Sequence, residues 1–279
     1  MHNASPRFRR AALDSIHRAS GGSVWRLPEV LGIGVGENHV KVTVLKEHPS
    51  HSRIPSSIHG YPVVLEVRNR PRHHTCPGSG PGNLRGGVVS GGVECPPGCS
   101  CTGIVSDATG SFILSAAHCM GQVCWPGGNI PFGGKTVAVL ERSALKCGST
   151  VNHLDASIAR LAPGVQSDRT ILGLGTPSGL AQPVVGDTIS IQGPFAGALS
   201  GTVTTINYEF QDIYDTLPGN CVVYHTNLFE VDFGGENGDS GSCGWNQNSK
   251  IVGLDMSGDG NLEQFCNLNY LQAELGVSF

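Results

Sequence analysis

The sequence predicts a mainly β protein, and three observations lead to that expectation. The chain of 279 residues contains 40 Gly and 17 Pro, which interrupt helices more strongly than any other residues. Short β-rich runs recur beyond residue 100 with turn residues between them, a pattern typical of a sandwich or a barrel. Hydrophobic residues make up 39% and charged residues 14%, so the chain can bury a core and is neither disordered nor a coiled coil.

Charge and hydropathy exclude two classes of partner. The formal charge of −4 lacks the basic excess that binding to phosphates needs, so no nucleic-acid partner is expected. No apolar run approaches the roughly 20 residues of a spanning helix, so no membrane partner is expected. Ten cysteines, an even number, favour disulfides and an oxidising compartment, whereas the polar first ten residues lack a signal-peptide core. The compartment and the oligomeric state stay open.

Residues 1–80 predict a small α+β domain that ends in a linker. Residues 8–20 have apolar side chains at helical spacing and precede two glycines, which predicts a short amphipathic helix. Strands are expected at residues 30–36, 39–44 and 61–67, the first two as a hairpin. From residue 70 to 98 the chain is too rich in Pro and Gly for regular structure, and we place the boundary near residue 80.

Residues 81–279 predict a second domain of short strands with a helix at its end. Strands are expected at residues 103–107, 111–116, 136–142, 155–161, 187–192, 201–208, 221–233 and 251–256. Asn267 is placed to cap a helix whose Leu268, Leu271 and Leu275 form one apolar stripe. We expect this stripe to dock on the β core.

A cluster of cysteines and histidines raises the question of a zinc site. It comprises His73, His74, Cys76, Cys95, Cys99 and Cys101. Zinc is often held by such side chains, but no second CxxC pair completes a four-ligand pattern. The expectation is therefore that the protein binds no metal and no cofactor.

The segment Gly238-Asp239-Ser240-Gly241 has the composition of a nucleophile turn. A serine hydroxyl needs a base to become a nucleophile, and the oxyanion formed on attack needs preorganised N–H donors. Flanking glycines allow the tight turn that directs backbone N–H groups to one point. The alternative is an ordinary surface turn, which contains the same residue types.

Two other motifs could supply a base and an orienting acid. Ser115-Ala116-Ala117-His118-Cys119 follows an apolar strand, and imidazole has the pKa of a general base near neutral pH. Asp155 opens another apolar strand, where its carboxylate could accept the Nδ1 proton of an imidazole. Most histidines, however, lie on the surface or in a satisfied core, and an acid at the start of a strand is common.

The motifs occur in the order His118, Asp155, Ser240, which is the chymotrypsin-type order. On these motifs, residues from about 84 to 279 resemble the trypsin-like serine proteases. The resemblance implies two six-stranded β-barrels with the site in the cleft between them. It implies Ser240 as nucleophile, His118 as general base and Asp155 as orienting acid, with the backbone N–H groups of Gly238 and Ser240 as oxyanion hole. A serine endopeptidase acting on a protein or peptide substrate is expected, and the alternative is a catalytically silent binding module with the same fold.

Other segments look like those of bacterial trypsin-like peptidases and the plant narrow-leaf proteases, which would account for the small leading domain. They are Gly32–Gly36, Gly60–Val64, Gly238–Ser242, Val252–Leu254 and the C-terminal helix. The resemblance to trypsins also implies a disulfide between Cys101 and Cys119 and, as a weaker expectation, one between Cys243 and Cys266. The pairing of the other six cysteines stays open.

The resemblance leaves the substrate preference open. Digestive trypsins carry an aspartate six residues before the serine, where this chain has Gly234, so specificity for Arg or Lys is not supported. Asp255 and Asp259 lie in the segment expected to form a wall of the substrate pocket, either as an acidic lining or as solvated turn residues. Arg85-Gly86 resembles a zymogen cleavage site whose new N-terminus would pair with Asp239, but the apolar residue expected after the cut is missing.

Overall fold

A computed structural model describes most of the chain beyond residue 30. The described residues are 24, 27, 30–46, 53–58, 60–68, 88–91, 98–120, 128–132, 135–148, 151–214 and 221–279. The helix expected at residues 8–20 and most of the linker lie outside these ranges, as does the boundary near residue 80. Within the described residues, no helix is long and apolar enough to cross a membrane.

Five antiparallel strands form the sheet of the first barrel. Their order is β6 (Gly103–Asp107), β7 (Gly110–Ser115), β11 (Ser157–Leu161), β9 (Lys135–Ser143) and β8 (Asn129–Phe132). Beside β6 lies a parallel pair, β5 (Val88–Gly91) with β12 (Gln166–Ile171). The short helix α2 (Ala117–Met120) follows β7 directly, and its four residues are all buried.

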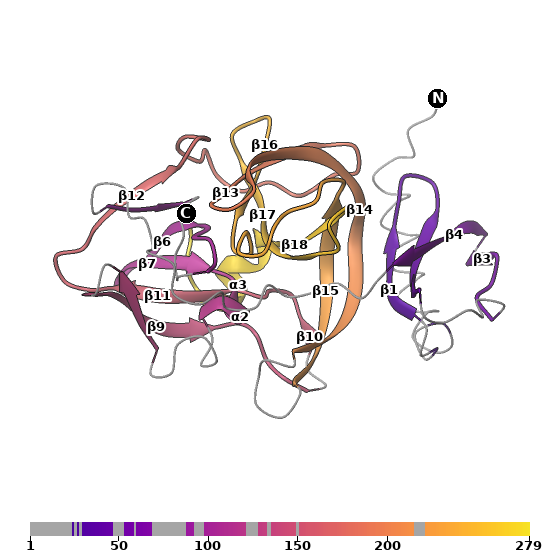
Figure 1. Ribbon diagram of the computed structural model, residues 1–279, viewed down its shortest axis with the longest axis horizontal. Helices are drawn as coiled ribbons and strands as arrows, with labels where there is room; N and C mark the ends of the chain where they lie inside the picture. Colours follow the sequence, from indigo (N-terminus) through magenta and orange to yellow (C-terminus); the bar gives the residue numbers. More distant parts are fainter. Residues whose placement is uncertain are drawn as a thin grey trace.

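Six antiparallel strands close the second barrel. They are β13 (Thr188–Gly193), β14 (Gly197–Tyr214), β15 (Cys221–Val231), β16 (Cys243–Asn246), β17 (Ile251–Gly258) and β18 (Glu263–Asn267). The ring closes because β14 pairs with both β13 and β15, while β18, β17 and β16 complete the circuit. The short strand β10 (Val151–Asn152) pairs in parallel with β15. The predicted mainly β fold with two barrels is therefore confirmed (Figure 1).

The N-terminal strands extend the sheet of the second barrel. They are β1 (Val30–Val35), β2 (Val40–Leu45), β3 (Ser57–Ile58) and β4 (Tyr61–Arg68). Strands β1, β2 and β4 lie close to where the sequence predicts them, whereas the sequence does not predict β3. As expected, β1 and β2 form an antiparallel pair, whereas β2 and β4 are parallel. In addition, β1 pairs with the long strand β14, so these four strands join the barrel edge to edge (Figure 1).

Glycines in β1 allow this close approach to β14. A Cβ atom at Gly32 would lie 2.1 Å from Tyr208 Oη, and one at Gly34 would lie 2.4 Å from Thr205 Cγ2. Both contacts are far inside van der Waals distance, so larger residues would push the strand away from the barrel. The Gly-x-Gly pattern of β1 thus follows from its packing against the fully buried Tyr208.

A group of four charges, three of them buried and Glu66 29% exposed, joins the N-terminal strands to the second barrel, and we call it the Glu230 cluster. It consists of Lys41, Glu66, Arg68 and Glu230. The Glu230 carboxylate, fully buried on β15, lies 2.6 Å from Lys41 Nζ and 2.8 Å from Arg68 Nη1. Burial alone would raise the pKa of Glu230, but the two cations outweigh it and lower that pKa.

The C-terminal end folds as the sequence predicts. Asn267 accepts a hydrogen bond from the backbone N–H of Asn269 and caps the 3₁₀ helix η2 (Leu268–Tyr270), which continues into α3 (Leu271–Leu275). Leu268, Leu271 and Leu275 are all buried in the main core cluster. The apolar stripe therefore docks on the β core.

We expect Glu230→Gln to lower the free energy of unfolding by about 3 to 5 kcal/mol, because it leaves buried cations without their main counter-ion. Glu141→Gln is the matched control, since its partner Arg160 is 39% exposed, and it should cost less than about 1 kcal/mol. Urea denaturation measures both values. Equal, small effects would show that the Glu230 cluster does not stabilise the fold.

Candidate active site

His118 and Asp155 meet at one end of the first barrel. His118 lies on α2 just after β7, and Asp155 lies just before β11, the strand that pairs with β7. His118 Nδ1 is 2.6 Å from Asp155 Oδ2, and the backbone N–H of His118 donates to Asp155 Oδ1 at 3.0 Å. Because the carboxylate holds both the ring and the backbone of one residue, the orientation of the imidazole is fixed.

Asp155 is fully buried, and two uncharged groups lie near it. Its own backbone N–H donates to the sulfur of Cys266 at 3.0 Å. Burial lowers the pKa of His225 to about 4 against the opposing charge of Asp155, so this second imidazole is neutral at pH 7. Asp155 therefore lies in a site of low polarity, where its charge acts strongly on the His118 ring.

Ser240 lies in a turn whose glycines adopt left-handed conformations. Gly238 has φ +104° and Gly241 has φ +91°, values that side chains with a Cβ rarely adopt. A Cβ at Gly241 would also lie 2.2 Å from Ser100 O. The Ser240 hydroxyl is fully buried and donates to Met256 O at 3.0 Å. The Gly-Asp-Ser-Gly sequence is thus a buried turn and not a surface one.

Hydrogen bonds tie this turn to the segment that leads into the first barrel. The backbone N–H of Ser100 donates to Ser240 O at 2.8 Å, and its hydroxyl donates to Gly238 O at 3.1 Å. The hydroxyl of Thr102 donates to Gly241 O at 2.7 Å. We call these three contacts the barrel junction. They place the Ser240 turn of the second barrel beside the first barrel, which carries His118.

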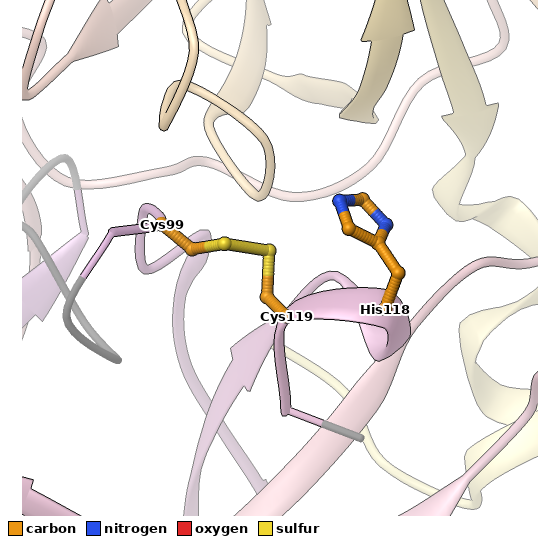
Figure 2. A group of neighbouring side chains, drawn as sticks. All are labelled: Cys99, His118 and Cys119. Carbon is orange, nitrogen blue, oxygen red and sulfur yellow. A yellow bond between two sulfur atoms is a disulfide. The ribbon is translucent and has the colours of Figure 1, made fainter. Parts of the chain in front are cut away.

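A disulfide secures the junction to α2. It joins Cys99 to Cys119, with Cα atoms 6.1 Å apart, and Cys119 Sγ is 3.9 Å from Ser240 O. The expected Cys101–Cys119 bond is wrong, because Cys101 packs inside the first barrel with Ile104 and Ile113. Figure 2 shows the disulfide and, beside it, the His118 ring rising from α2.

The expected Cys243–Cys266 disulfide is also wrong, since both side chains are buried free thiols. Both residues are paired with Leu254 of β17, from opposite sides. Two strand spacings of about 4.8 Å separate their backbones, which is more than a disulfide can span. Burial raises the pKa of both thiols.

Among the described residues, Cys99, His118 and Cys119 are of the types that bind metals, but the two cysteines are not free thiols. The potential ligand atoms of Cys99, His118 and Cys119 lie within 4.8 Å of one another. The two sulfur atoms are bonded to each other (Figure 2), so neither can act as the thiolate that zinc requires. His73, His74, Cys76 and Cys95, the remaining members of the sequence cluster apart from Cys101, lie outside the described residues.

The Asp239 carboxyl group, directly before Ser240 in the turn, is fully buried. Asp239 accepts hydrogen bonds from the backbone N–H groups of Phe195, Ala196 and Glu236. The possible cleavage site at Arg85-Gly86, whose product would pair with Asp239, lies outside the described residues. At Gly234, a Cβ atom would lie 2.1 Å from Gly260 O, so no side chain fits there. Asp259 is a turn residue that lies 3.7 Å from Arg68.

Asp255 of β17 and Glu263 of β18 are fully buried, and their side chains are hydrogen-bonded to each other. Burial, and then the charge of Glu263, raise the pKa of Asp255 well above its ordinary value. Burial also raises the pKa of Glu263 to about 7. The sequence gives no sign of Glu263, because the run Glu-Gln-Phe-Cys-Asn of β18 is buried on both faces and shows no alternation.

Comparison with solved structures identifies the fold. One similar structure is a glutamic acid-specific serine protease that uses a histidine triad in substrate binding, with 24% identity over 68% of this chain and 99% of its own (TM-score 0.53). A Nocardiopsis protease is 21% identical over 68% of this chain and 97% of its own (TM-score 0.54). The chain has the trypsin-like serine protease fold.

A chymotrypsin from Cellulomonas bogoriensis is similar to the same extent, with 21% identity over 68% of this chain and 97% of its own and a TM-score of 0.52. No family model and no curated protein sequence matches the chain. The expectation of a trypsin-like fold is confirmed by these structures, while the roles of individual residues stay predictions.

Glu263 makes the stability of this site depend on pH. In the folded protein, the Glu263 carboxyl group keeps its proton up to about pH 7, whereas in the unfolded chain it loses that proton near pH 4.5. The protonated carboxyl group therefore contributes fully to the free energy of unfolding below pH 4.5, and this contribution is lost as the pH rises to 7. Relative to Glu263→Gln, we expect the wild-type free energy of unfolding to fall by about 3 kcal/mol over that range. A difference independent of pH would contradict the raised pKa.

Proposed function

We propose that the protein is a serine endopeptidase that cleaves peptide bonds through an acyl-enzyme on Ser240. The observation that carries the proposal is the His118–Asp155 contact, next to Cys119, whose sulfur lies 3.9 Å from Ser240 O. Two solved structures that share the fold are named as a serine protease and as a protease, which supports a protein or peptide substrate.

His118 serves as general base and Asp155 as the group that orients it. The 2.6 Å contact keeps a proton on Nδ1, so that Nε2 is left to take the proton of the Ser240 hydroxyl. The imidazolium that forms is stabilised by the buried carboxylate. Before attack, the hydroxyl must turn from Met256 O towards Nε2, a realignment typical of sites without substrate.

The tetrahedral intermediate is stabilised by the backbone N–H groups of Gly238 and Ser240. The positive φ of Gly238 shapes the turn that would direct these groups to one point. The intermediate then expels the amine, which takes the proton from His118. Water, activated by the same imidazole, hydrolyses the acyl-enzyme and regenerates the serine.

A catalytically silent binding module is the alternative. One observation favours it: the Ser240 hydroxyl is fully buried and already bonded to Met256 O. Both functions use the same fold, but only the peptidase needs a hydroxyl that reacts with an electrophile.

A fluorophosphonate probe separates the two functions. We expect the wild type to be labelled at Ser240, as located by mass spectrometry of the digested adduct. Ser240→Ala should abolish labelling, while the surface variant Ser178→Ala should keep it. Folded protein that is not labelled, or labelling that survives Ser240→Ala, would refute the peptidase.

We expect Asp155→Asn to lower turnover about 10⁴-fold with the fold intact, because the amide no longer fixes the reactive tautomer of His118. Hydrolysis of a peptide library gives the rate, and circular dichroism reports the fold. Asp107→Asn is the control. It changes an acid at the β6–β7 turn, which lies at the end of β7 away from His118. Near-normal activity of Asp155→Asn would remove this residue from the proposed triad.

A further inference from the structure

Cys266 contacts the residue that orients His118. Its sulfur, fully buried on β18, accepts a hydrogen bond from the backbone N–H of Asp155 at 3.0 Å. The Asp155 carboxylate binds His118, and the carbonyl oxygen of Asp155 accepts from the backbone N–H of Ala117 at 3.2 Å. Asp155 is therefore held to α2 of the first barrel by one set of contacts and to β18 of the second barrel by another.

The same thiol contacts the residue that binds the Ser240 hydroxyl. Cys266 Sγ lies 3.8 Å from Met256 Sδ, placed so that its S–H group donates to that sulfur. Met256 lies on the neighbouring strand β17, and its carbonyl oxygen accepts the Ser240 hydroxyl at 3.0 Å. A chain of contacts thus runs from Asp155 of the first barrel through Cys266 and Met256 to the nucleophile turn.

A neutral thiol suits both contacts of Cys266. A thiol carries one weak donor and a weakly accepting sulfur, so it can accept from Asp155 and donate to Met256 at the same time. A thiolate would have no proton for Met256 and would put a second negative charge beside the Asp155 carboxylate. Burial, and then the charge of Asp155, raise the pKa of this thiol, so it keeps its proton at neutral pH.

We infer that Cys266 is a positioning residue, whose thiol holds the Asp155 carboxylate, and hence the imidazole that it orients, in place relative to Ser240. This inference rests on the proposed function. Asp155 lies in the loop between β10 and β11, so its place depends on the contacts that its backbone makes. The contact with Cys266 crosses from one barrel to the other, as the barrel junction does, but it ends at the orienting acid instead of at the nucleophile turn.

Cys243 offers a matched control for the loss of a buried thiol. Both cysteines pair with Leu254 of β17, from opposite sides, and both are fully buried free thiols. The Cys243 sulfur, however, contacts the carbonyl oxygen of Gly244 at 3.9 Å. Replacement by Ala therefore removes the same atom from a buried site at either position, but in Cys266→Ala it also removes the group that binds Asp155.

The proton between His118 Nδ1 and Asp155 Oδ2 tests the inference without any need for catalysis. A proton in a charge-assisted hydrogen bond as short as 2.6 Å gives a ¹H NMR signal far downfield of the ordinary amide signals. With the full chain, we expect this signal in the wild type and, at the same chemical shift, in Cys243→Ala. In Cys266→Ala it should move upfield or be lost, because Asp155 is held less firmly.

The kinetics of peptide hydrolysis give a second readout. We expect Cys266→Ala to lower kcat at least about tenfold with little change in KM, because it misplaces a catalytic group without touching the substrate. Cys243→Ala should leave kcat within about a factor of two of the wild type, since it misplaces no such group. Cys266→Ser keeps a donor and an acceptor at the same place, so it should recover most of the lost rate.

The outcomes separate the inference from the proposed function. A downfield signal and a kcat that survive in Cys266→Ala, or that Cys243→Ala loses to the same extent, would overturn the inference and leave the peptidase standing. A wild type without the signal would also overturn it, because His118 and Asp155 would then not be held together. No labelling by the fluorophosphonate and no hydrolysis of any peptide would refute the peptidase, while the signal would still show whether Cys266 holds Asp155.

A second pair of variants keeps the test decisive if Cys266→Ala does not fold. Cys266→Val fills the space of the thiol but offers no acceptor, whereas Cys266→Ser offers one. We expect Cys266→Ser to keep the downfield signal and Cys266→Val to lose it. Equal signals in these two variants would overturn the inference.

Discussion

The arrangement of the site depends on the barrel junction, the hydrogen bonds from Ser100 and Thr102 to the turn that carries Ser240. Serine and histidine belong to different barrels, far apart in the sequence, and no local propensity brings them together. The junction does so through backbone and hydroxyl groups that are fully buried. Since a buried polar group left without a partner is costly, the two barrels are held to one relative position.

Two further sets of contacts hold the parts of the molecule on either side of the barrel junction in place. The Cys99–Cys119 disulfide connects the junction to α2, and the Asp155 carboxylate then fixes the ring and backbone of His118. On the opposite side of the second barrel, the N-terminal strands continue its sheet and close over Glu230. Asp255 and Glu263 lie between these supports, beside the Ser240 turn, where glycines keep both neighbouring segments close.

Local patterns predicted most of the elements and the three motifs. Strands, the capped terminal helix and the glycine turn each depend on a few adjacent residues, so the sequence carries them. Long-range contacts were not predictable in this way. Choosing Cys99 over Cys101 depends on which side chain faces the first barrel's core, and the β1–β14 pairing depends on how Gly32 fits against Tyr208. Glu263 could not be predicted from the sequence, because a strand that is buried on both faces shows no alternation of polar and apolar residues.

The central claim is that Ser240, His118 and Asp155 act as one unit across the junction. Single-turnover hydrolysis by Ser240→Ala, His118→Ala and the double variant tests this most directly. When two residues act as one catalytic unit, replacing either one removes the rate enhancement of the whole unit. The double variant should therefore be no slower than either single variant. If the two losses multiplied instead, serine and histidine would contribute independently, and the account of a shared catalytic unit would be contradicted.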